Sequence, residues 1–141
     1  MIAVDTNILV YAHREELPDH ERALKRLRGL AEGSVPWVIP VFCLGEFVRV
    51  VTHPKVLSPP SSLDQALNAL QGLLDSPTVR ILNPGPQFPE FFRECVKEAD
   101  ARGNLSFDAQ IAALCREHGV NELLTLDRDF SRFADFKILA L

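Results

Sequence analysis

Four acidic residues stand where a carboxylate needs an explanation. Asp5 and Asp127 each end a short apolar run, Glu46 lies in the almost wholly apolar "VFCLGEFVRVV", and Asp108 opens "DAQIAAL". Carboxylates from separate segments that met within a few ångströms would repel strongly unless protons or cations intervened. Oxygen-only sites suit Mg²⁺ or Mn²⁺, and paired ions roughly 4 Å apart can clamp the attacking and leaving oxygens of a phosphoryl displacement. The pattern predicts a metal-dependent phosphodiesterase.

Each of these acids also has a simpler interpretation. Glu46 can form an ion pair with Arg49 three residues later in a helix. Asp108 falls in a first helical turn, where an acid interacts favourably with the helix dipole. Asp5 can cap the helix that follows it, and Asp127 can be a turn residue. Only the combination of four acids favours a metal site.

The hydrophobic pattern predicts strands that alternate with helices, and this alternation is typical of a parallel sheet covered on both faces. We expect an α/β fold: a three-layer α/β/α sandwich around a mostly parallel sheet of four to five strands. In such sheets the ligand crevice lies outside the carboxyl ends of the strands, so Asp5 and Asp127 should both face it. The expected strands are 2–4, 37–39, 79–82 and 123–126, with 136–139 as a candidate fifth, and the expected helices are 8–11 (capped by Thr6 or Asn7), 19–33, 41–51, 62–74, 89–102 and 106–118.

Composition and charge narrow the class of protein. The 141 residues fit one domain over 1–141, and 47% hydrophobic with 24% charged residues is ordinary for a globular protein. The longest apolar stretch is broken by prolines and is too short for a membrane helix, and the N-terminus does not resemble a secretory signal, so a cytoplasmic protein is expected. A net charge of −4 gives no global attraction to a polyanion, so a nucleic acid would have to be held locally.

Cysteine and histidine spacing gives no sign of a zinc site. Cys43, Cys95 and Cys115 each lie in an expected helix without a Cys-x-x-Cys spacing, so we expect reduced core residues. No two of the four histidines lie four residues apart on one helical face.

The acidic positions form an ordered set of motifs. These are Asp5-Thr6-Asn7 after the first strand, Glu46 in a mid-chain helix, "FDAQIAAL" around Asp108, and Thr125-x-Asp127-x-Asp129-Phe130. The set resembles that of PIN-domain ribonucleases, and the short chain and the gaps between motifs are similar to VapC-type toxins of toxin–antitoxin pairs. The resemblance covers essentially the whole chain, and it rests on the order of the motifs, since none is specific alone.

The resemblance implies a fold, a chemistry and partners. Asp5, Glu46, Asp108 and Asp127 would be the catalytic acids that hold one or two Mg²⁺ or Mn²⁺ ions. A metal-activated water would attack a phosphodiester bond of RNA, a second ion would stabilise the leaving 3′ oxygen, and the products would carry 5′-phosphate and 3′-hydroxyl ends. Related toxins usually form homodimers and are inhibited by a small antitoxin. Asn7 and Thr125 would orient ligands or contact substrate, and for Asp129 an outer role or a cap is at least as well supported as direct ligation.

RNA would require basic residues near the acids. Arg14, Arg128 and Arg132 are the candidate RNA contacts, and His13 is more readily a surface residue or RNA contact than a base. The cluster of Lys25, Arg26 and Arg28 is more simply a solvated helix face. The apolar helices at 8–11 and 63–74 are possible contact surfaces, although core packing explains them more simply.

Two other classes of protein fit parts of the pattern. A phosphoacceptor receiver domain would need an adjacent acidic pair after the first strand and a lysine beyond the last one, whereas this chain has only Asp5 there and places Lys137 within its last expected strand. A non-catalytic PIN-like module that binds RNA or protein is the stronger alternative, and the intact set of four acids argues against it.

Overall fold

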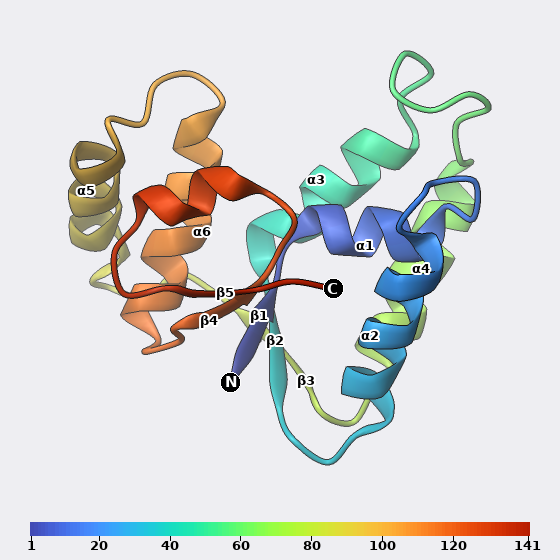
Figure 1. The fold of residues 1–141 in the computed structure, drawn as a ribbon, viewed down its shortest axis with the longest axis horizontal. Helices are drawn as coiled ribbons and strands as arrows, with labels where there is room; N and C mark the ends of the chain where they lie inside the picture. The colour runs from blue at the N-terminus through green and yellow to red at the C-terminus, as the bar shows by residue number, and fades with distance from the viewer.

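The computed structural model describes residues 1–141 and contains five strands, six α-helices and one short 3₁₀ helix (Figure 1). The strands are β1 (Ile2–Val4), β2 (Trp37–Pro40), β3 (Val79–Leu82), β4 (Glu122–Leu124) and β5 (Lys137–Leu139). The helices are α1 (Thr6–His13), α2 (His20–Glu32), α3 (Val41–Val51), α4 (Leu63–Leu74), α5 (Phe88–Ala99), α6 (Leu105–Glu117) and the 3₁₀ helix η1 (Arg128–Arg132).

All five strands form one parallel sheet in the order β3-β2-β1-β4-β5. Helices α1 to α4 cover one face, and α5, α6 and η1 cover the other (Figure 1). This arrangement follows from right-handed crossovers, because the chain steps from β1 to β3 in one direction and then returns to place β4 on the other side of β1. The predicted three-layer α/β/α fold is confirmed, and the possible fifth strand is present.

Local sequence sets most helix ends. Of the candidate caps, Asp5 and not Thr6 or Asn7 is the N-cap of α1, and its Oδ1 accepts a 2.7 Å hydrogen bond from the Thr6 backbone N–H. Ser62 caps α4 through the predicted capping box with Gln65. Helix α5 ends at Ala99, three residues before the predicted end, because Asp100 adopts a left-handed φ of 48° that cannot continue a right-handed helix.

The core lies between the sheet and both helical layers. Every residue of β2 is buried, as expected for a central strand covered on both faces. The largest fully buried side chains include Trp37, Phe47 and Phe130, from three separate elements. The three cysteines are buried and free, as predicted. No helix is both long and apolar enough to cross a bilayer.

Candidate active site

The centre of the sheet brings the two ends of the chain together. Strand order reverses between β1 and β4, and in parallel α/β sheets this reversal opens the ligand crevice at the carboxyl edge. Val4 pairs with Leu124, and the backbone N–H of Asp5 donates to the Leu124 carbonyl at 3.1 Å. Asp5 and Thr125 are therefore held next to each other although 120 positions separate them.

Thr125 joins three groups of this crevice. It is 2% exposed, and its hydroxyl donates a 2.7 Å hydrogen bond to Asp5 Oδ2. The same oxygen accepts from the Asn7 side-chain amide at 3.2 Å and from the Asp127 backbone N–H at 3.0 Å. A hydroxyl has one proton and two lone pairs, so these contacts use its full capacity. Thr125 thus fixes the Asp5 carboxylate and the start of the Asp127 loop.

Glu46 reaches the crevice from α3 and is held by a residue that the sequence did not single out. Thr6 is buried, and its hydroxyl donates to Glu46 Oε2 at 3.0 Å. The alternative partner, Arg49, is 3.9 Å from Glu46 Oε1, which is long for an ion pair. The motif "DTN" placed Thr6 directly after Asp5, but a threonine that follows a strand is equally typical of a helix cap, so its contact with Glu46 was not predicted.

Three aspartates form the tightest group of acids. One carboxylate oxygen each from Asp108, Asp127 and Asp129 lies within 4.8 Å of the others. Asp127 Oδ1 also accepts from the Asp129 backbone N–H at 2.9 Å, so Asp127, and not Asp129, caps η1. Asp129 is exposed and lies 3.7 Å from the Arg132 guanidinium. Its carboxylate is thereby placed beside two of the acids expected to hold metal.

One cavity of about 380 Å³ is lined by all four predicted acids. Asp5, Glu46, Asp108 and Asp127 border it together with Asn7 and Thr6. Its other wall is apolar and comes from α1, α3 and the segments that follow them, with Val10, Tyr11, Leu17, Val50, Val56 and Leu57. The structure therefore gathers carboxylates from four separate segments at one end of a partly apolar cavity.

Burial, together with crowding of the acids, raises the pKa values of Asp5 and Asp108. Burial, assisted by the charges of Glu46 and Asp127 and opposed by hydrogen bonds from Thr125 and Thr6, raises the pKa of Asp5 from 3.8 to about 6. Burial and then the charges of the neighbouring acids, Asp127 first, raise the pKa of Asp108 from 3.8 to about 7. A cation relieves this repulsion, and a donor set made only of oxygens fits Mg²⁺ or Mn²⁺.

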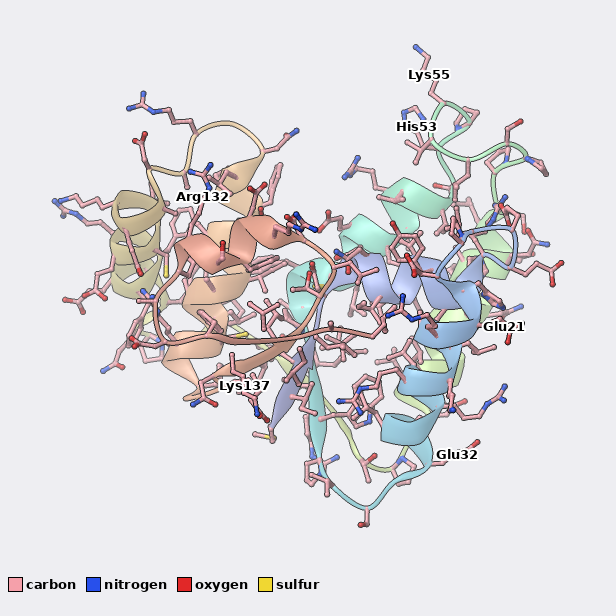
Figure 2. All side chains as sticks on the ribbon, in the orientation of Figure 1. Glu21, Glu32, His53, Lys55, Arg132 and Lys137 are labelled. Carbon is pink, nitrogen blue, oxygen red and sulfur yellow. The ribbon has the colours of Figure 1, made fainter.

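The candidate RNA contacts fall into two groups. Arg128 and Arg132 are exposed on η1 beside the acids. Figure 2 shows Arg132 on one side of the carboxyl edge of the sheet and His53 and Lys55 on the loop at the other side, whereas Lys137 lies toward the opposite edge.

Arg14 differs from these two arginines because it is only 8% exposed. Its guanidinium donates to Glu16, to the Ser61 hydroxyl and to the Pro59 carbonyl. These contacts tie the end of α1 to the loop before α4. A structural role suits Arg14 better than the RNA contact expected from its position in the sequence.

Comparisons with known proteins give a consistent result. The family model described as PIN domain matches residues 2–136. Ribonuclease VapC43 of Mycobacterium tuberculosis is 38% identical over 133 residues, which cover 94% of this chain and 90% of that protein. Ribonuclease VapC31 of the same organism is 31% identical over 137 residues, covering 97% and 96%.

Solved structures share the fold. Mycobacterium tuberculosis VapC20, described as a Sarcin-Ricin loop cleaving toxin, superposes with a TM-score of 0.70 at 24% identity over 93% of both chains. A second structure is VapBC2 from Rickettsia felis, which is bound to a DNA fragment from its promoter. One of its chains superposes with a TM-score of 0.72 at 21% identity, covering 99% of this chain and 98% of that one.

Proposed function

The chain belongs to the PIN-domain family, and from that premise we propose that it is a VapC-type endoribonuclease that hydrolyses RNA phosphodiester bonds with Mg²⁺ or Mn²⁺. The observation that supports this best is the single cavity bordered by Asp5, Glu46, Asp108 and Asp127. Nothing in the packing of a small α/β domain requires four acids from four segments to meet. Their mutual repulsion costs stability, so a cation-dependent activity is the simplest reason for the arrangement.

The acids divide into two groups with different roles. Asp108, Asp127 and Asp129 have oxygens close enough to share one cation, while Asp5 and Glu46 border the same cavity and offer oxygens to that ion or to a second one. When bound, such an ion supplies an activated water and neutralises charge that develops on the phosphate oxygens. Asp129 is thereby proposed as a direct ligand as well as Asp127.

Neighbouring polar groups aim the carboxylates. The Thr125 and Thr6 hydroxyls donate hydrogen bonds to Asp5 and Glu46, and the Thr6 backbone N–H donates another to Asp5. The remaining lone pairs of these carboxylates can then face a cation. Asn7 accepts from the Leu126 backbone N–H at 3.4 Å and so supports the loop that carries Asp127.

The residues of the cavity also bear on the products. No histidine lines it, and His13 instead pairs with the Ser61 hydroxyl at 2.9 Å. A site without a paired histidine is poorly equipped to use the RNA 2′-hydroxyl as the nucleophile. We therefore propose hydrolysis by water, with 5′-phosphate and 3′-hydroxyl products.

An apolar groove supports the proposal of an antitoxin partner. Helices α1, α2 and α4 with Phe47 of α3 enclose about 320 Å³, lined mainly by aliphatic side chains. A surface groove lined by apolar side chains is typical of an interface. We propose that a cognate antitoxin binds here, and that a second copy of the chain completes a homodimer.

Cleavage of RNA by matched variants tests the function. Purified protein is incubated with a panel of structured RNAs and Mg²⁺ or Mn²⁺, and the ends of the products are mapped. We expect wild-type cleavage to stop on removal of the metal and in Asp5→Asn, whereas Asp64→Asn, an exposed acid in the first turn of α4, stays active. Equal cleavage by Asp5→Asn would contradict the proposal, and RNA binding without cleavage by wild type would favour the non-catalytic module.

A further inference from the structure

A second groove lies on the other side of Glu46 from the acidic cavity. It encloses about 290 Å³ between α3 and α6. Glu46 borders both cavities, so the groove continues directly from the site proposed for catalysis. The side chains that shape it are Phe42, Glu46, Arg49, Phe107, Gln110 and Ile111.

Phe107 is the least expected member of this groove. Its side chain is 55% exposed, although Phe47 and Phe130 are buried in the core. Phe42 packs near Phe88 with ring centroids 5.8 Å apart, but Phe107 pairs with no other ring of the protein. It directly precedes Asp108, so the exposed ring stands at the rim of the acidic cluster. Core packing gives no reason for an aromatic ring there.

Two polar side chains complete the groove. The Arg49 side chain is 63% exposed, and its only nearby carboxylate is Glu46 at 3.9 Å. Its guanidinium therefore keeps most of its hydrogen-bonding capacity for a ligand. Gln110 lies one turn of α6 beyond Phe107 and adds an amide that both donates and accepts.

We propose that this groove binds the nucleotide next to the scissile phosphate, with its base stacked on Phe107 and its phosphate paired with Arg49. Gln110 then reads an edge of that base. This inference rests on the function proposed above. Recognition of single-stranded RNA uses aromatic platforms beside cationic side chains, and this groove offers both within reach of the acids.

The charged residues favour RNA over a protein in this groove. Protein interfaces are depleted of glutamate, whereas Glu46 lies in this groove beside the exposed Arg49. A phosphate at Arg49 would meet an opposite charge, and Glu46, which borders both cavities, would then lie beside the next phosphate of the same strand as one of the residues that would hold a cation. A second copy of the chain is the competing occupant and is one outcome of the test.

Steady-state cleavage of a fluorescein-labelled single-stranded RNA that the wild type cuts tests the platform. We compare Phe107→Ala and Phe107→Trp with Leu67→Ala, a matched control that is also 55% exposed but lies on α4. Loss of one base stack raises KM of Phe107→Ala about tenfold with a smaller change in kcat, while the tryptophan variant stays close to wild type. Leu67→Ala leaves KM unchanged.

The phosphate contact has a separate signature. Removing one cation from a single-stranded site lowers the slope of log affinity against log salt by roughly 0.7. We expect this change in Arg49→Gln and not in Arg49→Lys or in Lys25→Gln, an exposed residue of α2. Isothermal titration of Mn²⁺ and light scattering accompany each variant, and both metal affinity and oligomeric state should match the wild type.

The outcomes separate the two proposals. A wild type that cleaves RNA, with an unchanged KM in Phe107→Ala, overturns the platform and leaves the ribonuclease proposal standing. Dissociation of an oligomer by Phe107→Ala without an effect on KM assigns the groove to self-association and likewise overturns the platform. A wild type that neither binds nor cleaves any RNA overturns both proposals.

Discussion

At the scale of single residues, hydroxyl groups decide how the acids are presented. Thr6 and Thr125 each use their only proton on a carboxylate of the crevice. The meeting of the four acids at one cavity was predictable, because each lies within or at an end of an apolar segment. Thr6 was not, since a hydroxyl that follows a strand has several equally good local partners. The partners that bury Arg14 lie 45 or more positions away, so its role was hidden from any local pattern.

Replacement of Thr6 tests this orientation. Thr6→Val keeps the shape but removes the donor to Glu46, so we expect cleavage to fall about 10- to 100-fold. Loss of the hydrogen bond should lower the free energy of unfolding by about 1 kcal/mol. Thr6→Ser retains the donor and should restore most activity. Urea denaturation beside the cleavage assay separates the two effects, and full activity in Thr6→Val would remove the positioning role.

The raised pKa values of Asp5 and Asp108 predict how stability changes with pH. Without metal, the folded state keeps protons on these acids up to about pH 6 and about pH 7, whereas the unfolded state releases them near 3.8. Their contribution is therefore complete below about pH 4 and is lost as the pH rises through 6 and 7. Asp108→Asn should gain stability over wild type at pH 8, by on the order of 1 kcal/mol, and not at pH 4.

The same protons compete with a cation. Divalent-ion binding requires the charged carboxylates, so Mn²⁺ affinity should weaken about tenfold for each pH unit below about 7, where Asp108 takes up its proton. Isothermal titration between pH 6 and 8 measures this slope. A flat profile would exclude Asp108 from the ligands.

At the scale of elements, periodicity predicted helices well and strand neighbours poorly. Helix α3 and strand β3 have the predicted bounds, because apolar spacing and flanking prolines or turns define them locally. Strand β4 is shorter than predicted and ends at Leu124, where Thr125 turns its hydroxyl toward Asp5. The order β3-β2-β1-β4-β5 could not be predicted. Buried parallel strands are apolar throughout, so their sequences do not indicate which strands pair with each other.

Two glycines give opposite predictions for helix stability. Gly119 follows α6 with a φ of +68°, so Gly119→Ala strains the backbone and should cost about 1 kcal/mol. Gly72 lies within α4 with no atom within 4 Å of an added Cβ, so Gly72→Ala should stabilise by up to about 1 kcal/mol. Thermal unfolding of both variants measures whether each change stabilises or destabilises the protein, and a destabilised Gly72→Ala would contradict the open space found around this position.

At the scale of the whole molecule, the acids lie close enough to share a cation only when the chain is folded. An ion that binds only the native state stabilises it by mass action, by about 2.7 kcal/mol when its concentration is 100 times Kd. Mn²⁺ should therefore raise the urea midpoint of wild type and of Asp64→Asn, the α4 control. Asp108→Asn should lose most of this effect, and an equal increase in all three would indicate nonspecific binding.

The pairing of β1 with β4 also has a consequence for synthesis on the ribosome. Asp5 and Glu46 emerge early, but Asp108, Asp127 and Asp129 follow in the last third of the chain, and β1 has no partner on that side until then. A chain still under synthesis therefore lacks the cation cluster, and under the function proposed above it does not yet cleave RNA. A fragment that stops before β4 should accordingly show no Mn²⁺-dependent cleavage, so the proposed activity would begin only once synthesis has passed Asp129.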